Sequence, residues 1–220
     1  MKRVLAVAAG AVLSWALPTS PVRADGLQTD VDQATAIIIR FGDMPEKGIP
    51  DAVMRKAQGV AVLTVFKAGF GLSGQGGKGL VIARTPSGWT GPSAIATGGA
   101  GFGFQIGAEI TEFVIILNTS EAVNAFARGG NVTIGADLSV AAGPVGRNLA
   151  AGVMPLAAIY TYSLSQGLFA GLSLQGAVIV TRDASNREFY GRAVTPAEIL
   201  SGKLEAPAGA SKLIEALRRY

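Results

Sequence analysis

The feature that most constrains the fold of this 220-residue chain is a glycine-rich stretch at residues 59–84, GVAVLTVFKAGFGLSGQGGKGLVIAR. Residues 60–66 form an apolar, β-branched run, which predicts a strand buried on both faces. Residues 67–69 predict a turn, and a return strand ends at residues 80–84. Glycine in a strand marks a bulge, a sharp bend or a close approach of two backbones. The return strand therefore predicts strong curvature, as at the corner of a barrel, because it contains glycine at positions 71, 74, 76, 77 and 79.

A second stretch repeats this pattern further along the chain. Residues 157–164 predict a strand, residues 165–167 a turn, and residues 168–182 a return strand. The core sequence GLSxQG occurs at residues 71–76 and again at residues 171–176. Because two copies are too few for a solenoid, we predict one domain with two similar hairpins. Chance similarity between glycine-rich strands is the alternative.

An amphipathic helix is predicted at residues 30–41, where apolar residues recur at helical spacing behind Asp30 as the N-cap. Two interpretations are open, since the apolar side either packs on the domain or lies on a membrane. The membrane interpretation would use Ile37, Ile38 and Phe41. The polar side carries only one basic residue, Arg40, which favours packing on the domain.

The remaining elements complete an α+β pattern. Further strands are predicted at residues 89–97, 98–107, 111–117 and 131–142. Helices are predicted at residues 49–57, 118–128 and 210–220, together with a short helix that starts at Pro196 and is capped by Thr195. We predict a curved, glycine-rich antiparallel β-sheet, barrel-like, with flanking N- and C-terminal helices.

The start of the chain resembles a targeting segment. Lys2 and Arg3 precede an apolar run at residues 4–17, and a small residue stands at the end, Ala24. This pattern predicts a secretory signal peptide, and hence an exported, periplasmic protein that can lie at the periphery of a membrane. We divide the chain into a signal peptide (1–24), an amphipathic helix (25–45), a main domain (46–192) and a helical tail (193–220).

The charge of the chain gives little support for a nucleic-acid partner. There are 19 basic and 15 acidic residues, but Lys2, Arg3 and Arg23 belong to the predicted signal peptide. Without these three the two signs nearly balance, whereas nucleic-acid-binding domains present a basic surface. An anionic partner must therefore meet a local basic patch.

The residue types present exclude several classes of chemistry. The chain has no histidine and no cysteine, which excludes Ser-His and Cys-His nucleophiles and ordinary zinc sites. Glu109 and Glu112 stand at odd spacing on a predicted strand, so they point to opposite faces and cannot form a glycosidase pair. Residues 74–79 match G-x-G-x-x-G, but a strand follows where pyrophosphate binding needs a helix N-terminus. We predict a non-enzymatic protein without nucleotide, cofactor or metal.

Six basic residues are candidates for binding an anionic ligand, namely Arg55, Lys56, Lys67, Lys78, Arg84 and Arg147. Lys67 and Lys78 stand among glycines, where backbone N–H groups and an ammonium bind phosphate together. A solvated surface charge is the alternative for each lysine. Arg147 stands in a loop framed by glycine and proline, and its alternative role is an ion pair with Glu109, Glu112 or Asp137.

Short motifs in a fixed order run through residues 49–192. They are Ile-Pro at 49–50, Ala-Gln-Gly at 57–59, LTVFKAGF at 63–70, Pro-Ser-Ala-Ile at 92–95, Gly-Ala-Glu at 107–109, Asn-Val-Thr at 131–133, SVAAGP at 139–144 with Gly-Arg at 146–147, GLFAG at 167–171 and Phe-Tyr-Gly at 189–191. Together these motifs resemble the SYLF domain, the lipid-binding module of actin-patch regulators in yeast and of related animal and plant proteins.

The resemblance implies a non-enzymatic domain that binds anionic phospholipid, which is phosphoinositide in eukaryotic members, and that in some members binds and bundles actin. It also implies that an N-terminal amphipathic helix, here residues 30–41, contributes to membrane binding. We predict peripheral binding of anionic membrane lipid through the basic loops and this helix. One alternative is a periplasmic structural or protein-interaction module without lipid binding, whose protein partner is unknown. Another, a small outer-membrane barrel, is disfavoured by the helices at both ends and by strands of the buried type.

Overall fold

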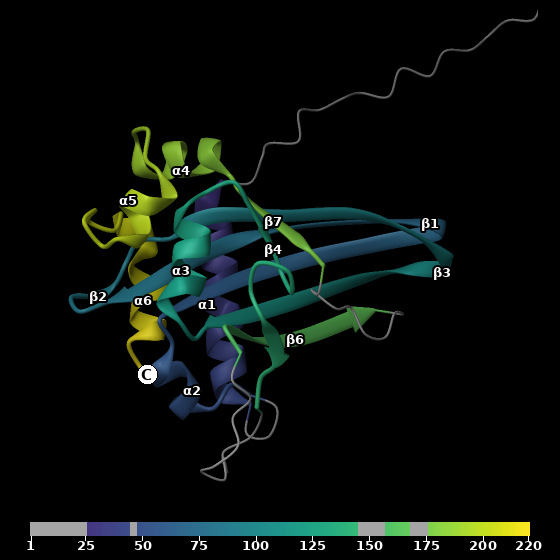
Figure 1. Ribbon diagram of the computed structural model, residues 1–220, viewed down its shortest axis with the longest axis horizontal. Helices are drawn as coiled ribbons and strands as arrows, with labels where there is room; N and C mark the ends of the chain where they lie inside the picture. The colour runs from purple at the N-terminus through teal and green to yellow at the C-terminus, as the bar shows by residue number, and fades with distance from the viewer. Residues whose placement is uncertain (1–25, 45–47, 145–156, 168–175) are drawn as a thin grey trace, which may run out of the picture.

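Two very long strands organise the fold in the computed structural model of the chain (Figure 1). The structure describes residues 26–44, 48–144, 157–167 and 176–220, with only the backbone at residues 70–73 and 100–106. The strands are β1 (Gly59–Thr85), β2 (Gly88–Trp89), β3 (Ser93–Leu117), β4 (Asn131–Thr133), β5 (Val140–Ala142), β6 (Ile159–Gly167) and β7 (Val178–Thr181). The helices are α1 (Leu27–Asp43), α2 (Asp51–Lys56), α3 (Ser120–Ala127), α4 (Asp183–Tyr190), α5 (Pro196–Leu200), the 3₁₀ turn η1 (Ala208–Ala210) and α6 (Ser211–Leu217).

Strands β1 and β3 form an antiparallel ribbon along almost their whole lengths, from the pair Gly59–Leu117 to the pair Val81–Ser93. β6 pairs with the second half of β3, and β7 pairs with its first half. β2 pairs with the end of β1, β4 pairs with β7, and β5 lies parallel to β6. In Figure 1 the helices gather at one end of this seven-stranded sheet, and β1 and β3 extend beyond them at the other end.

Strand β1 bends back on itself in its glycine-rich middle. The Arg84 N–H donates to the Gln58 carbonyl at 2.8 Å, which brings the two ends of the strand together. Further along, a Cβ on Gly79 would lie 1.9 Å from the Val62 carbonyl oxygen. Because no side chain fits in that space, only glycine permits this approach of the two halves. The predicted curvature and close backbone approach are therefore confirmed.

The turns predicted at residues 67–69 and 165–167 are wrong. Residues 67–69 continue the pairing of β1 with β3, and residues 165–167 continue the pairing of β6 with β3. The register of the β1–β3 ribbon shifts between Phe70 and Leu72, and such an irregularity bends a strand without ending it. The chain therefore reverses by bending rather than by a tight turn. In the second copy of the repeat, residues 168–175 lie outside the described residues.

Both faces of the sheet are buried at the end that the helices cover. On one face, α1, α2 and α6 share a core with side chains such as Val62 and Ile116. On the other face, α3 and α5 share a second core with side chains such as Leu63 and Ile115. Neighbouring residues alternate between the two cores because successive side chains of a strand point to opposite faces. This arrangement confirms the predicted burial on both faces for residues 60–65, whereas Phe66 at the end of the run is 51% exposed.

The predicted fold class is confirmed. The chain is α+β, with a curled, glycine-rich and mostly antiparallel half-barrel sheet flanked by N- and C-terminal helices. The helix predicted at residues 30–41 forms as α1, but its N-cap is Gly26. Asp30 does not cap it, because its carboxylate is buried in an ion pair with Arg182.

Two strand predictions differ from the structure. The three segments predicted within residues 89–117 are mainly one strand, β3, because Pro92 precedes the strand and does not interrupt it. The single strand predicted at residues 131–142 is divided into β4 and β5. The chain turns between them with Gly135 at a φ of 91°, a conformation that glycine favours.

Candidate functional site

The six basic residues of the sequence hypothesis do not form one patch. Arg55 and Lys56 end α2, and Arg84 lies at the end of β1 beside them. Lys67 and Lys78 lie closer to the bent middle of β1. Arg147 lies outside the described residues. The five described candidates are therefore divided between two places in the fold.

Arg84 joins α2 to β1 and β2. Its Nη2 donates to the Met54 carbonyl at 3.0 Å, and its guanidinium carbon lies 4.4 Å from the centroid of the Trp89 ring. Burial lowers the pKa of Arg84, although a guanidinium keeps its charge in proteins. These contacts give Arg84 a structural role.

Arg55 and Lys56 are exposed at the end of α2. Arg55 lies 3.7 Å from the carboxylate of Asp51, one helical turn earlier. Exposed pairs of this kind add little stability, so neither cation is fixed in place. They can attract an anionic surface.

An apolar groove lies beside Lys78, on the sheet face that also carries α1. Phe66 and Ile110 are cross-strand partners in the β1–β3 ribbon, and they are 51% and 48% exposed. Large exposed apolar groups that adjoin one another mark interaction sites. The groove has a volume of about 400 Å³ and is lined by Gln33 of α1, by Thr64, Phe66, Gly76, Gly77 and Lys78 of β1, and by Ile110 of β3.

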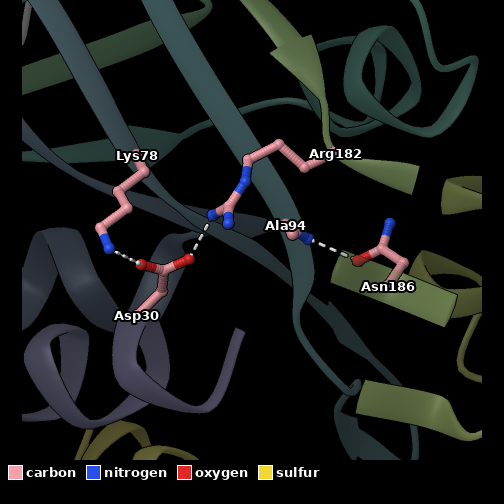
Figure 2. A network of polar contacts seen from close by, with 5 residues as sticks. All are labelled: Asp30, Lys78, Ala94, Arg182 and Asn186. Atoms are coloured by element: carbon pink, nitrogen blue, oxygen red, sulfur yellow. Dashed lines mark hydrogen bonds and ion pairs between the residues drawn. The ribbon is translucent and has the colours of Figure 1, made fainter. Parts of the chain in front are cut away.

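Lys78 also belongs to a buried network of charges that joins α1 to the sheet (Figure 2). Its ammonium lies 3.9 Å from Oδ1 of Asp30, and Nη1 of Arg182 donates to Oδ2 of the same carboxylate at 2.5 Å. The Asp30 side chain is fully buried, whereas those of Arg182 and Lys78 are 18% and 33% exposed. Next to this network, the Ala94 N–H donates to Asn186 Oδ1 at 2.7 Å and ties α4 to β3. Two cations thus share one carboxylate at the edge of the groove.

Lys67 lies on the sheet face opposite the groove, because it follows Phe66 in the same strand. Its cross-strand partner is Glu109, whose side chain is buried. Glu112 lies on the groove face instead, where it forms an ion pair with Arg40 of α1. The prediction that the two glutamates point to opposite faces is confirmed.

The sequence hypothesis contains Lys78 but misses the residues around it. The sequence places Phe66 in a fully buried strand, but its side chain is 51% exposed. Ile110 precedes the strand predicted at residues 111–117, and Asp30 was expected to cap a helix. The sequence gives one sign that Phe66 could be exposed: it ends the apolar run and is followed by a polar residue.

Comparison with known proteins identifies the family of this chain. A family profile described as "Ysc84: Las17-binding protein actin regulator" matches residues 98–220, more than half of the chain. The chain belongs to the Ysc84 family. The resemblance to the SYLF domain is therefore confirmed. The match includes α5 and α6, so the Ysc84 profile also covers the segment that the sequence analysis set apart as a tail.

Several relatives align with most of the chain. The SH3 domain-containing YSC84-like protein 1 of Bos taurus is 45% identical over 202 residues, which cover 88% of this chain and 59% of that protein. Its counterpart in Xenopus laevis is 51% identical over 190 residues, covering 84% and 56%. Protein YSC84 of Saccharomyces cerevisiae is 45% identical over 174 residues, covering 77% and 37%. The chain thus spans at most 59% of the length of these relatives.

The predicted periplasmic location is wrong. The relatives are eukaryotic members of the Ysc84 family, which is described as an actin regulator, and they point to the cytosol rather than to a periplasm. The periplasmic prediction rested on one indication alone, the short basic and apolar stretch at residues 1–24. Residues 1–24, predicted as a signal peptide, lie outside the described residues.

Helix α1 does not present its apolar side to a membrane in this structure. Ile37, Ile38 and Phe41 are at most 2% exposed and belong to the core beneath the sheet. This is the arrangement of a helix packed on the domain, and the predicted membrane contact through these residues is incompatible with it. Among the described residues, no helix combines the length and the apolarity that crossing a membrane requires.

Proposed function

We propose that this Ysc84-family domain binds anionic phospholipid at a membrane surface, through the groove formed by Phe66, Ile110 and Lys78. The observation that carries the proposal is the half-exposed pair Phe66–Ile110 beside a lysine ammonium. A phospholipid offers the matching chemistry, because it carries acyl chains next to a phosphate. The groove volume of about 400 Å³ is within the range of small-ligand sites.

The basic residues contribute unequally in this proposal. Among the five candidates that the structure describes, only Lys78 lines the groove. Arg55 and Lys56 lie at the α2 end and add only longer-range attraction, which salt screens. The Lys67 side chain lies on the opposite face of the sheet, and Arg84 is engaged in structural contacts. A role for Arg147 stays a prediction.

We also propose that the domain binds without catalysing a reaction. Glu109 and Glu112 leave opposite faces of the sheet, so they cannot act as a carboxylate pair. Within the described part of the chain, the residues that line the groove include no carboxylate. An acyl chain and a phosphate would therefore meet an apolar wall and one ammonium, which can hold a lipid but supply no general base.

The test is co-sedimentation of the full chain with vesicles of phosphatidylcholine, alone or mixed with an anionic phospholipid. We expect binding only to the anionic vesicles, weakened by salt because part of the attraction is electrostatic. The same binding to both vesicle types, or none to either, would contradict the proposal.

Substitutions locate the contact. Fully burying a phenylalanine or isoleucine is worth about 1.5–3 kcal/mol, so the exposed half of each side chain is worth about 1 kcal/mol. Phe66→Ser combined with Ile110→Ser should therefore weaken binding by about 2 kcal/mol, or roughly 30-fold. Val180→Ser is the matched control, because Val180 is also exposed, at 36%, but does not line the groove. An equal loss in the control would place the contact elsewhere.

A second candidate function is binding of a protein. It rests on the family description, which names Las17 binding and actin regulation. Co-sedimentation with actin filaments in the absence of lipid would support this function. If the chain binds filaments but no vesicle, protein binding becomes the better account of the domain.

A further inference from the structure

We propose that a second copy of this chain pairs with the outer edge of β6, the backbone of residues 163–167 that points away from β3. The two copies would then join their sheets across a twofold axis. The inference concerns a surface that the proposed function does not use, and it does not depend on lipid binding.

Strand β6 lies at the border of the sheet, on the side of β3 away from β1 (Figure 1). It pairs with β3 along its whole length, from Ile159 to Gly167. On its other side, among the described residues, only β5 pairs with it, and this pairing ends with Ala142 opposite Thr161. Residues 163–167 therefore keep an edge along which no described strand lies.

The hydrogen bonds beside β5 reveal which backbone groups of β6 point outward. The Ile159 N–H donates to the residue before β5, and the Thr161 carbonyl accepts from the residue after it, both at 3.1 Å. Because successive residues of a strand direct their N–H and C=O groups to alternate edges, the backbone of residues 163, 165 and 167 also points outward. This edge therefore offers the donors and acceptors that an added strand satisfies.

The outer edge of β6 lacks the features by which proteins protect exposed strands. Its sequence at residues 163–167, SLSQG, contains no charged residue and no proline. Its pairing with β3 advances residue by residue, without a bulge. Since charge, proline and bulges are what prevent strand addition at an edge, this edge is suited to pairing.

A second copy fits this edge because the edge is complementary to itself. In antiparallel pairing about a twofold axis, the same surface of each copy meets the other. We place the axis at Ser165, because residues 163 and 167 then face each other and all three outward residues are paired. A register shifted toward β5 is excluded, since Thr161 already bonds there. The absence of charge at residues 163–167 lets two identical strands approach without repulsion.

The side chains of β6 agree with this register. Ser165 is exposed, and its hydroxyl forms a hydrogen bond with that of Thr111 at 3.0 Å. Leu164 lies on the opposite face, where it packs against the core that α1 shares with the sheet. In the paired arrangement the two Ser165 side chains lie opposite each other, and they are small enough for close approach. The two Leu164 side chains become diagonal neighbours, about 7–8 Å apart, within reach of each other.

Ser165 also supplies the test. Its N–H points outward, so proline at this position removes no bond to β3 but removes the central donor of the pairing. Ser165→Ala is the matched control. Both substitutions lose the hydroxyl bond to Thr111, and only proline also loses the N–H.

The experiment measures self-association of the full chain by sedimentation velocity, from about 1 μM to about 500 μM, because a small interface gives weak association. We expect the wild-type chain and Ser165→Ala to form dimers to the same extent as the concentration rises. Ser165→Pro should raise the dissociation constant at least about tenfold, since the dimer loses a central hydrogen bond from each copy. A wild-type chain that stays monomeric throughout, or equal association of the two variants, would overturn the inference.

Hydrogen exchange provides a measurement without any substitution, should Ser165→Pro fail to fold. The amides of residues 163, 165 and 167 should exchange more slowly at high protein concentration, whereas those of residues 162 and 164, which point to β3, should be protected at every concentration. Protection of the three outward amides already in the dilute monomer would overturn the inference, because another part of the chain would then cover this edge. Neither measurement contains lipid, so its failure leaves the proposed function intact, and a failure of vesicle binding leaves this inference intact.

Discussion

Replacing Asp30 by asparagine should destabilise the fold strongly. The carboxylate is fully buried and is shared by Arg182 and Lys78, and the change leaves both cations without it. Breaking a buried ion pair from one side costs about 3–5 kcal/mol. Lys78 is 33% exposed and can turn to solvent, whereas Arg182 is only 18% exposed. We therefore expect the lower end of this range, about 3 kcal/mol, borne mainly by Arg182.

The assay is urea unfolding of wild-type and Asp30→Asn chains, followed by circular dichroism and tryptophan fluorescence. A loss of about 3 kcal/mol also corresponds to a fall in the melting temperature of about 6–12 °C for a domain of this size. Asp51→Asn is the control, because Asp51 and Arg55 are 67% and 58% exposed and lie 3.7 Å apart. Loss of that solvent-screened pair should change stability by less than about 1 kcal/mol.

The reasoning would be refuted if Asp30→Asn and Asp51→Asn changed the free energy of unfolding equally. That result would mean that water or other groups replace the carboxylate. A second substitution sharpens the test. Asn at position 30 leaves the Arg182 cation buried without a carboxylate, and Arg182→Gln removes that cation. The double variant should lose less stability than the sum of the two single variants, because the two groups are in contact.

Three further predictions concern stability. Gly79→Ala should cost at least about 3 kcal/mol in urea unfolding, since its Cβ would lie 1.9 Å from the Val62 oxygen and force the halves of β1 apart. Burial raises the pKa of Tyr162 and Tyr190, so the stability they provide is complete below about pH 10 and falls as the pH rises above it. Urea unfolding between about pH 8 and pH 11 should reveal this fall, and Tyr162→Phe should reduce it. Thr195→Ala should cost about 1 kcal/mol in the same assay, because it removes the capping box of α5.

The class of fold could be predicted because it depends on local patterns. The period of the apolar residues in α1 and the continuous run at residues 60–66 identify elements whose burial the structure confirms, except at Phe66. Thr195 was likewise predicted as a cap from sequence, and it accepts the Glu198 N–H as expected. Each of these features is decided within a few residues of chain.

The path of the long strands could not be predicted, because glycine permits both a turn and a bend. Residues 67–69 have turn chemistry, yet they stay in β1 because β3 pairs with them residue by residue. That partner is distant in sequence, so no local pattern distinguishes the two conformations. The same pairing explains why three predicted segments merge into β3.

The candidate site was predictable only in part, for the same reason. The glycine context identified Lys78, but its neighbour Arg182 meets Asp30 across 152 residues of sequence. The exposure of Phe66 depends on its tertiary neighbours, which apolar periodicity does not specify. The apolar side of α1 shows a related limit. Its pattern predicts that Ile37, Ile38 and Phe41 are buried, but not which surface buries them, and here that surface is the sheet.

In the network around Asp30, we expect Arg182 to stabilise the fold and Lys78 to contribute to the proposed binding. Arg182 lies 2.5 Å from the carboxylate, whereas Lys78 lies 3.9 Å from it and is almost twice as exposed, at 33% against 18%. Lys78→Gln should therefore cost less than about 1 kcal/mol in urea unfolding, as for a solvent-screened pair, while it weakens binding to anionic vesicles. Arg182→Gln should instead lower the free energy of unfolding by about 3 kcal/mol, because it leaves Asp30 buried without its closer partner. Equal losses of stability in the two variants would show that Lys78 is also a structural cation, and its role in binding would then need another explanation.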